Sequence, residues 1–169
     1  NLVGGSDTDS FTFLETGVLA GTIDGGGDSD TIVGDDDGNI FTVDTSNGGT
    51  LTDTVGNPKT NGFSNVENLS GGSSTDTFTI ESGGKPDGDI VGGDDVDTVD
   101  IQLGGSVGGD VSTGLHDDLI TIDGIVGGSV NGGDGDDVFH LKGSASIAAG
   151  VNGDDGNDTF TIDGAGVAA

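Results

Sequence analysis

Apolar side chains recur at two fixed positions of a long repeat. One set lies two residues after a recurring acidic residue and consists of Phe11, Ile32, Phe78, Val99, Ile120, Phe139 and Phe160. The other set lies seven residues before that acid and consists of Leu2, Ile23, Leu69, Ile90, Val111, Val130 and Val151. Alternation of apolar and polar residues around these positions is typical of short strands with one buried face. The pattern predicts two strands per repeat and two apolar columns in one core.

The acids that fix this register are spaced by about 21 residues, and the register predicts that they form one column. They are Asp9, Asp30, Asp76, Asp97, Asp118, Asp137 and Asp158, with successive gaps of 21, 46, 21, 21, 19 and 21 residues. Two strands and two turns in so short a unit indicate one coil of a solenoid. We therefore predict an all-β fold, a right-handed parallel β-solenoid (β-roll or β-helix) whose stacked coils lie about 4.8 Å apart.

The gap of 46 residues holds the irregular part of the array. A nine-residue unit at 25–33 runs directly into a second one at 34–42, in which Asn39 takes the place of the acid. We divide the single array into coils at 1–43, an irregular insertion at 44–62, interpreted as a broader coil or a protruding hairpin, and regular coils at 63–169. Residues 1–12 match residues 68–79, which suggests a segment of a longer, duplicated protein.

The composition is strongly acidic and rich in glycine. The chain has 37 glycines and 31 acidic residues against three basic ones, and its net charge is -28. Such a charge disfavours nucleic acid and anionic membranes as partners, and no apolar run is long enough for membrane insertion. Few large apolar residues and high charge predict a disordered chain unless cations neutralise the acids. The absence of cysteine leaves metal as the candidate stabilising cross-link.

The turns before the acids carry the candidate chemistry. Residues 132–140 read Gly-Gly-Asp-Gly-Asp-Asp-Val-Phe-His, which fits the pattern G-G-x-G-x-D-x-U-x with U a large apolar residue. Glycines allow positive φ angles and leave main-chain carbonyls uncovered. A turn of bare carbonyls closed by a carboxylate suits a hard cation such as Ca2+, which takes about six to eight oxygen ligands.

This nonapeptide resembles the repeat of the RTX, or haemolysin-type calcium-binding, proteins. Residues 153–161 fit it with one substitution, and the other units replace the fourth-position glycine by Asp7, Asp28, Ser74, Asp95 or His116. One motif per coil is similar to the β-solenoid repeats of giant bacterial surface adhesins. Residues 63–72 also resemble linking segments of such proteins.

The resemblance implies a set of calcium ligands. Calcium would lie between adjacent turns, held by the closing carboxylates and by main-chain carbonyls. Carried over to this sequence, the ligand positions are Asp9, Asp30, Asn39, Asp76, Asp97, Asp118, Asp137 and Asp158, with Asp28, Asp95, Gly133, Gly135, Gly153 and Gly156 in the turns.

The function expected from these features is structural. We expect an extracellular, calcium-folded segment of a secreted bacterial surface protein, such as an adhesin stalk, a filament or an S-layer, with self-association into a filament or lattice as a further expectation. An ice-binding solenoid and a polysaccharide-acting β-helix enzyme are the alternatives. Ice binding needs regular threonine ladders, and a lyase generally needs a basic residue, whereas this chain has no arginine and three scattered lysines. His116 and His140 occupy different repeat positions, which disfavours a transition-metal site.

Overall fold

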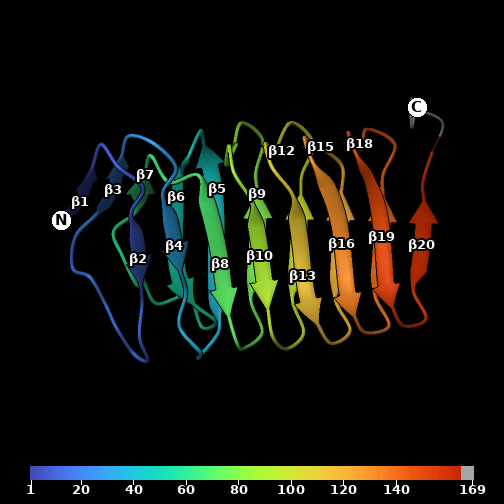
Figure 1. Cartoon of the computed structure of the whole chain (residues 1–169), viewed down its shortest axis with the longest axis horizontal. Coiled ribbons are helices and arrows are strands. Elements are labelled where there is room, and N and C mark those ends of the chain that lie inside the picture. Colours follow the sequence, from blue (N-terminus) through green and yellow to red (C-terminus); the bar gives the residue numbers. More distant parts are fainter. Residues whose placement is uncertain (165–169) are drawn as a thin grey trace.

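The chain winds into a β-solenoid built of three rows of strands (Figure 1). The computed structural model describes residues 1–164, and within this range there is no helix. The ten-stranded first sheet has the spatial order β1 (Leu2–Gly5), β3 (Ile23–Gly26), β7 (Phe63–Ser64), β6 (Gly48–Asp53), β5 (Asn39–Thr45), β9 (Thr77–Ile80), β11 (Thr98–Ile101), β14 (Leu119–Ile122), β17 (Val138–Leu141) and β20 (Thr159–Ile162).

Two further sheets complete the coils. The seven-stranded second sheet has the order β19 (Gly150–Asp155), β16 (Ser129–Asp134), β13 (Val111–Leu115), β10 (Ile90–Gly93), β8 (Asn68–Gly72), β4 (Thr31–Val33) and β2 (Ser10–Thr12). The three-stranded third sheet has the order β12 (Ser106–Val107), β15 (Ile125–Val126) and β18 (Ser146–Ile147). In Figure 1 the second sheet lies in front and runs down, the first runs up behind it, and the chain advances from left to right. This winding is right-handed, and the predicted solenoid is confirmed.

Like residues of successive coils lie side by side in the regular part. Val99 pairs with Phe78 on one side and with Ile120 on the other, and all pairings among β9, β11, β14, β17 and β20 are parallel. Ile90 pairs with Leu69 and Val111 in the second sheet in the same way. The repeat length read from the sequence is therefore the length of one coil.

The register predicted across all seven repeats is wrong at the irregular part. Ile32 pairs with Leu69 of the second sheet, whereas the strand that extends the Phe78 column is β5, in which Phe41 pairs with Phe78. The reason is the nine-residue step from Asp30 to Asn39. Nine residues span about half a coil, so the turn of the second nonapeptide lies at the opposite edge of the solenoid. The turns of the later repeats lie at that same edge.

An antiparallel hairpin fills the segment that the sequence left irregular. Strands β5 and β6 pair with Phe41 opposite Leu51, and both side chains are fully buried. The first sheet continues through this hairpin in the order β7, β6, β5, β9. The hairpin is thus a part of the sheet rather than a protrusion from it.

The core lies between the sheets and contains most of the predicted apolar columns, together with side chains outside them such as Ile80, Ile101 and Ile122. Phe78, Val99, Ile120 and Phe139 are fully buried in one column. The facing column contains Leu69, Ile90, Val111 and Val130, which are also buried. Phe160 was expected in the first column but is 47% exposed, because no described coil covers its outer face. Its ring stacks on Phe139 with the centroids 4.6 Å apart.

Replacement of Phe139 by alanine is expected to lower the free energy of unfolding by about 3–5 kcal/mol, because a fully buried aromatic ring is lost from a closed core. Chemical denaturation of the folded protein would measure this effect. Phe160→Ala is the matched control, since it removes the same side chain from a half-exposed position and should cost less. Equal losses for the two variants would contradict the burial described here.

Candidate metal centre

The two glycines that open most regular turns make room for different neighbours, whereas Thr113 takes the first position of one turn and Asp154 the second position of another. A Cβ atom on Gly71, in the first position, would lie 2.1 Å from Oδ2 of Asp76, the acid that closes the same turn. Gly93, in the second position, has φ of 126°, and a Cβ atom there would lie 1.9 Å from the carbonyl oxygen of Gly72 in the preceding coil. The first glycine therefore admits the folded-back carboxylate, and the second admits the neighbouring backbone.

The closing acids point inward and form a row that we call the long ladder. Each member accepts, through its side-chain oxygen, the main-chain N–H of the member one coil earlier. These bonds measure 2.6 Å from Asn39 to Asp76, 2.7 Å from Asp76 to Asp97, 2.6 Å from Asp97 to Asp118, 2.8 Å from Asp118 to Asp137 and 3.1 Å from Asp137 to Asp158. The sequence-predicted acids of the regular repeats are thus brought together, one per coil.

The second carboxylate oxygen of these acids has no hydrogen-bonding partner. Oδ2 is buried and unpaired in Asp76, Asp97, Asp118 and Asp137, and also in Asp30. Burial raises the pKa of Asp97 to about 8 and the pKa of Asp76 and Asp118 to about 6, and it also raises the pKa of Asp137. A buried carboxylate costs free energy unless a cation or a proton neutralises it.

Main-chain oxygens from the next coil face the unpaired carboxylate oxygens. The space above Gly71 is bounded by Oδ2 of Asp76 and by the carbonyl oxygen of Gly92, which would lie 2.1 and 2.6 Å from a Cβ atom there. Oδ2 of Asp97 and the carbonyl oxygen of Thr113 bound the space above Gly92 in the same way, at 2.2 and 2.4 Å. Two acceptors without a donor between them fit a bound cation with oxygen ligands.

Asp9 and Asp30 form a separate row, the short ladder. The N–H of Asp9 donates to Oδ1 of Asp30 over 2.8 Å. Their turns follow strands of the first sheet, β1 and β3, whereas the turns of the long ladder follow strands of the second sheet. The two sheets run in opposite directions, so the ladders lie at opposite edges of the solenoid (Figure 1). The single column expected from the sequence is therefore two.

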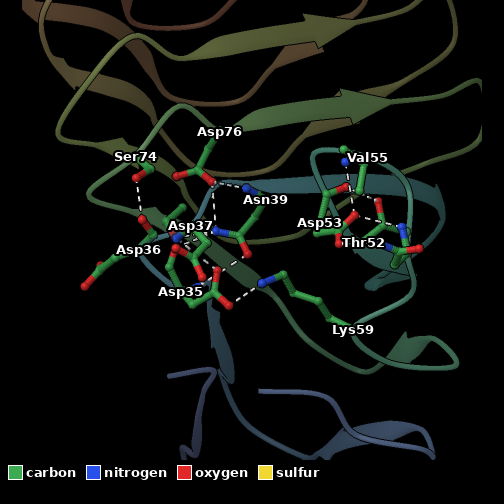
Figure 2. A network of polar contacts seen from close by, with 12 residues as sticks. Asp35, Asp36, Asp37, Asn39, Thr52, Asp53, Val55, Lys59, Ser74 and Asp76 are labelled. Atoms are coloured by element: carbon green, nitrogen blue, oxygen red, sulfur yellow. Dashed lines mark hydrogen bonds and ion pairs between the residues drawn. The ribbon is translucent and has the colours of Figure 1, made fainter. Parts of the chain in front are cut away.

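Asn39 occupies the first place of the long ladder and is satisfied without an ion (Figure 2). Its Nδ2 donates to the carbonyl oxygens of Asp35 (2.8 Å) and Gly71 (3.2 Å) and to Oδ1 of Asp76 (2.8 Å). The buried Lys59 ammonium pairs with Oδ2 of the buried Asp35 beside it. The amide of Asn39 therefore satisfies the neighbouring carbonyls and Oδ1 of Asp76, and the ammonium of Lys59 neutralises Asp35.

The remaining predicted residues divide into backbone and surface positions. Gly133 and Gly135 have φ of 121° and 155°, and Gly156 has φ of 148°. A Cβ atom on Gly153 would lie 1.9 Å from Oδ2 of Asp158, so this glycine makes room for its acid. Asp28 and Asp95 take positive φ angles in place of glycine, and their side chains are exposed rather than turned into a ladder.

Two charged contacts at the edges of the solenoid were not predicted from the sequence. Glu67 accepts the N–H of Asp30 through Oε2 over 2.8 Å and so extends the short ladder. Lys59 is buried against Asp35, although charged side chains in an inserted segment are usually solvated. Neither lies in a nonapeptide, so the repeat pattern contained no signal for them.

The ladders are not clusters of converging side chains. Among residues 1–164, no group of three or more histidine, cysteine, aspartate or glutamate side chains is placed to hold one metal ion. Any ion held between coils would depend on one or two carboxylates together with main-chain carbonyls. Ca2+ accepts such mixed oxygen ligands, whereas Zn2+ prefers nitrogen and sulfur.

Comparison with known proteins does not assign the chain to a family. No family model, no curated protein and no solved structure matches it. The part of the chain that the structure describes contains no helix that is both long and apolar enough to cross a membrane.

Proposed function

We propose that this chain is a calcium-binding structural solenoid, in which ions between successive coils hold the fold together. The observation that carries the proposal is the row of buried, unpaired Oδ2 atoms on Asp76, Asp97, Asp118 and Asp137. They recur once per coil, and those of Asp76, Asp97 and Asp137 face main-chain carbonyl oxygens, so a cation with oxygen ligands would satisfy both. At Asp118 the hydroxyl of Thr113 lies in the glycine's place and donates to the carbonyl of Gly132. The resemblance of residues 132–140 to the RTX nonapeptide supports the same ion.

The proposed role is mechanical rather than catalytic. A stack of like coils makes a stiff rod, and its length follows from the number of repeats. Exposed apolar side chains on the last described coil, such as Ile162, support stacking between copies. A location on the bacterial cell surface, as an adhesin stalk, filament or S-layer, is the part of the proposal that comes from the resemblance to secreted repeat proteins.

The outer face of the first sheet does not favour the ice-binding alternative. The outward row that begins with Thr77 and Thr98 continues with Leu119 and Val138 before Thr159. The neighbouring row has Asp100 and His140 between its threonines. Ordered ladders of one residue type are therefore broken in both rows.

The three lysines, all among the described residues, do not gather into one basic site. Lys59 is buried against Asp35, and Lys85 pairs with Asp87 on the surface. Lys142 is exposed and far along the chain from both. The lysines are thus either engaged or isolated, which supports a structural function over an enzymatic one.

Native mass spectrometry of the calcium-loaded protein tests the proposal directly. We expect several bound calcium ions, and fewer in Asp137→Asn, because an amide there would donate to neighbouring carbonyls as Asn39 does. Asp136→Asn is the matched control, since it removes the same charge from an exposed side chain one residue away and should keep the full number. Absence of bound calcium from the wild-type protein, or equal loss in both variants, would contradict the proposal.

A further inference from the structure

The segment at residues 63–68 follows the short ladder but contains no nonapeptide. It nevertheless stacks on the coil of Asp30, because Thr31 of β4 pairs with Asn68 of β8. Asp30 and Glu67 therefore each come directly before one member of this pair. Successive acids of a ladder are placed in the same way. The N–H of Asp30 donates to Oε2 of Glu67 over 2.8 Å, the same length as the bond from Asp9 to Asp30. Glu67 stands in the place of the next acid.

The carbonyl of Asn65 stands in the place of a first-position glycine carbonyl. A Cβ atom on Gly25 would lie 2.4 Å from Oδ2 of Asp30 and 1.9 Å from the carbonyl oxygen of Asn65. This repeats the arrangement of Asp76 Oδ2 and the Gly92 carbonyl around Gly71. Asn65 has φ of 51°, a left-handed conformation that asparagine tolerates better than most residues and that turns the backbone there.

Asp30 supplies a buried acceptor that needs a partner. The residue is fully buried, its Oδ1 accepts the N–H of Asp9, and its Oδ2 has no hydrogen bond. The carboxylate of Glu67 is held in position from the other side, since its Oε1 accepts Nδ2 of Asn47 over 2.8 Å. A fixed carboxylate oxygen and a fixed carbonyl oxygen therefore face each other across a space that excludes any side chain at Gly25.

We propose that Asp30 and the carbonyl of Asn65, with Glu67 as the charged positioning residue, form a divalent-cation site that ends the short ladder. The site lies at the edge opposite the long ladder, and one side of it is built by a segment without the repeat motif. It rests on the proposed calcium function, because the same ion would occupy both edges. The hairpin and the linking segment would then be joined to the first coils by an ion as well as by the sheet.

Paramagnetic NMR tests this site separately from the long ladder. Mn2+ replaces Ca2+ at sites of carboxylate and carbonyl oxygens and broadens the signals of nearby nuclei. In the calcium-loaded protein with a small fraction of Mn2+, we expect broadening of the Val66 amide, whose peptide group includes the Asn65 carbonyl. The Gly93 amide shares its peptide group with the Gly92 carbonyl and reports on the long ladder.

The variant Asp30→Asn tests whether a cation binds between Asp30 and the carbonyl of Asn65. We expect its Val66 amide to broaden less than in the wild-type protein, its Gly93 amide to broaden as before, and its calcium count to fall. Glu67→Gln keeps an acceptor for the Asp30 amide and should need several-fold more Mn2+ for the same broadening. A wild-type Val66 signal that stays sharp while Gly93 broadens would overturn this site and leave the calcium function standing. No calcium uptake at all would instead overturn the proposed function.

Discussion

Removal of calcium is expected to unfold the chain at neutral pH. Without an ion, the side chains of Asp76, Asp97, Asp118 and Asp137 would each be buried with an unpaired oxygen, and each would have to stay charged or take up a proton. The effective cost of burying an unpaired charge is on the order of several kcal/mol per ion. The net charge of -28 adds repulsion throughout the chain. Circular dichroism in excess chelator should therefore show a disordered chain, and added calcium should restore the strand signal.

Magnesium and an amide variant provide the controls. Magnesium should restore the strand signal poorly, because it keeps its waters and demands a tighter octahedral geometry. Replacing all four of these aspartates by asparagine should make the fold independent of calcium, since each amide could donate as Nδ2 of Asn39 does. If the wild-type protein kept its full strand content in chelator, packing alone would hold the solenoid and calcium would be an accessory.

The regular coils could be predicted from the sequence because their pattern is local and repeated. Apolar residues two positions after each acid, such as Val99 and Ile120, define one column, and the pairing of β11 with β14 places them side by side. The glycines before the acid indicated a turn with exposed carbonyls. In most turns the first glycine makes room for the inward carboxylate, although Asp118 also points inward behind Thr113.

The acids change from one edge of the solenoid to the other between the short and the long ladder. The sequence contains a signal for this change, but it was not predicted. Asp30 and Asn39 are nine residues apart, and in a coil of about 21 residues such a step leads to the opposite edge. Aligning on acids alone hides this change, because the later gaps restore the same spacing. The hairpin also masks it, since β6 joins the first sheet in antiparallel orientation and gives no repeat signal.

The roles of Glu67 and Lys59 depend on contacts between distant parts of the chain. Glu67 reaches the Asp30 amide across 37 residues, and Lys59 pairs with Asp35 across 24 residues. Neither sequence separation is a multiple of the number of residues in a coil, because the residues of the hairpin lie between the two partners. Such partners follow only from the three-dimensional path of the insertion.

Acidification is expected to fold the metal-free protein. The pKa of Asp97 is raised to about 8 and those of Asp76 and Asp118 to about 6, whereas an unfolded aspartate has a pKa of about 3.9. A raised folded-state pKa means that the fold binds protons more tightly than the unfolded chain. The stability that these protons supply is fully present below the unfolded pKa, and it is lost as the pH rises through the folded pKa values.

The strand signal of the metal-free protein should therefore grow as the pH falls from about 8 to about 4. Calcium should act in the opposite direction, because it needs ionised carboxylates and competes with protons for the same oxygens. Its stabilising effect should be large at pH about 8 and small near pH about 4. Urea unfolding across this range, with protein stripped of metal and with protein saturated with calcium, would measure both trends.

Asp97→Asn provides the control for this pH dependence. It removes a carboxyl group whose pKa is raised to about 8, so the metal-free variant should keep more of its stability above pH about 6 than the wild-type protein does. Asp94→Asn changes the same charge on an exposed side chain nearby and should leave the pH profile close to that of the wild type. Metal-free stability that rose with pH between about 4 and 8 would show that the ladder acids are ionised in the fold without a cation, and that their burial is not what limits its stability.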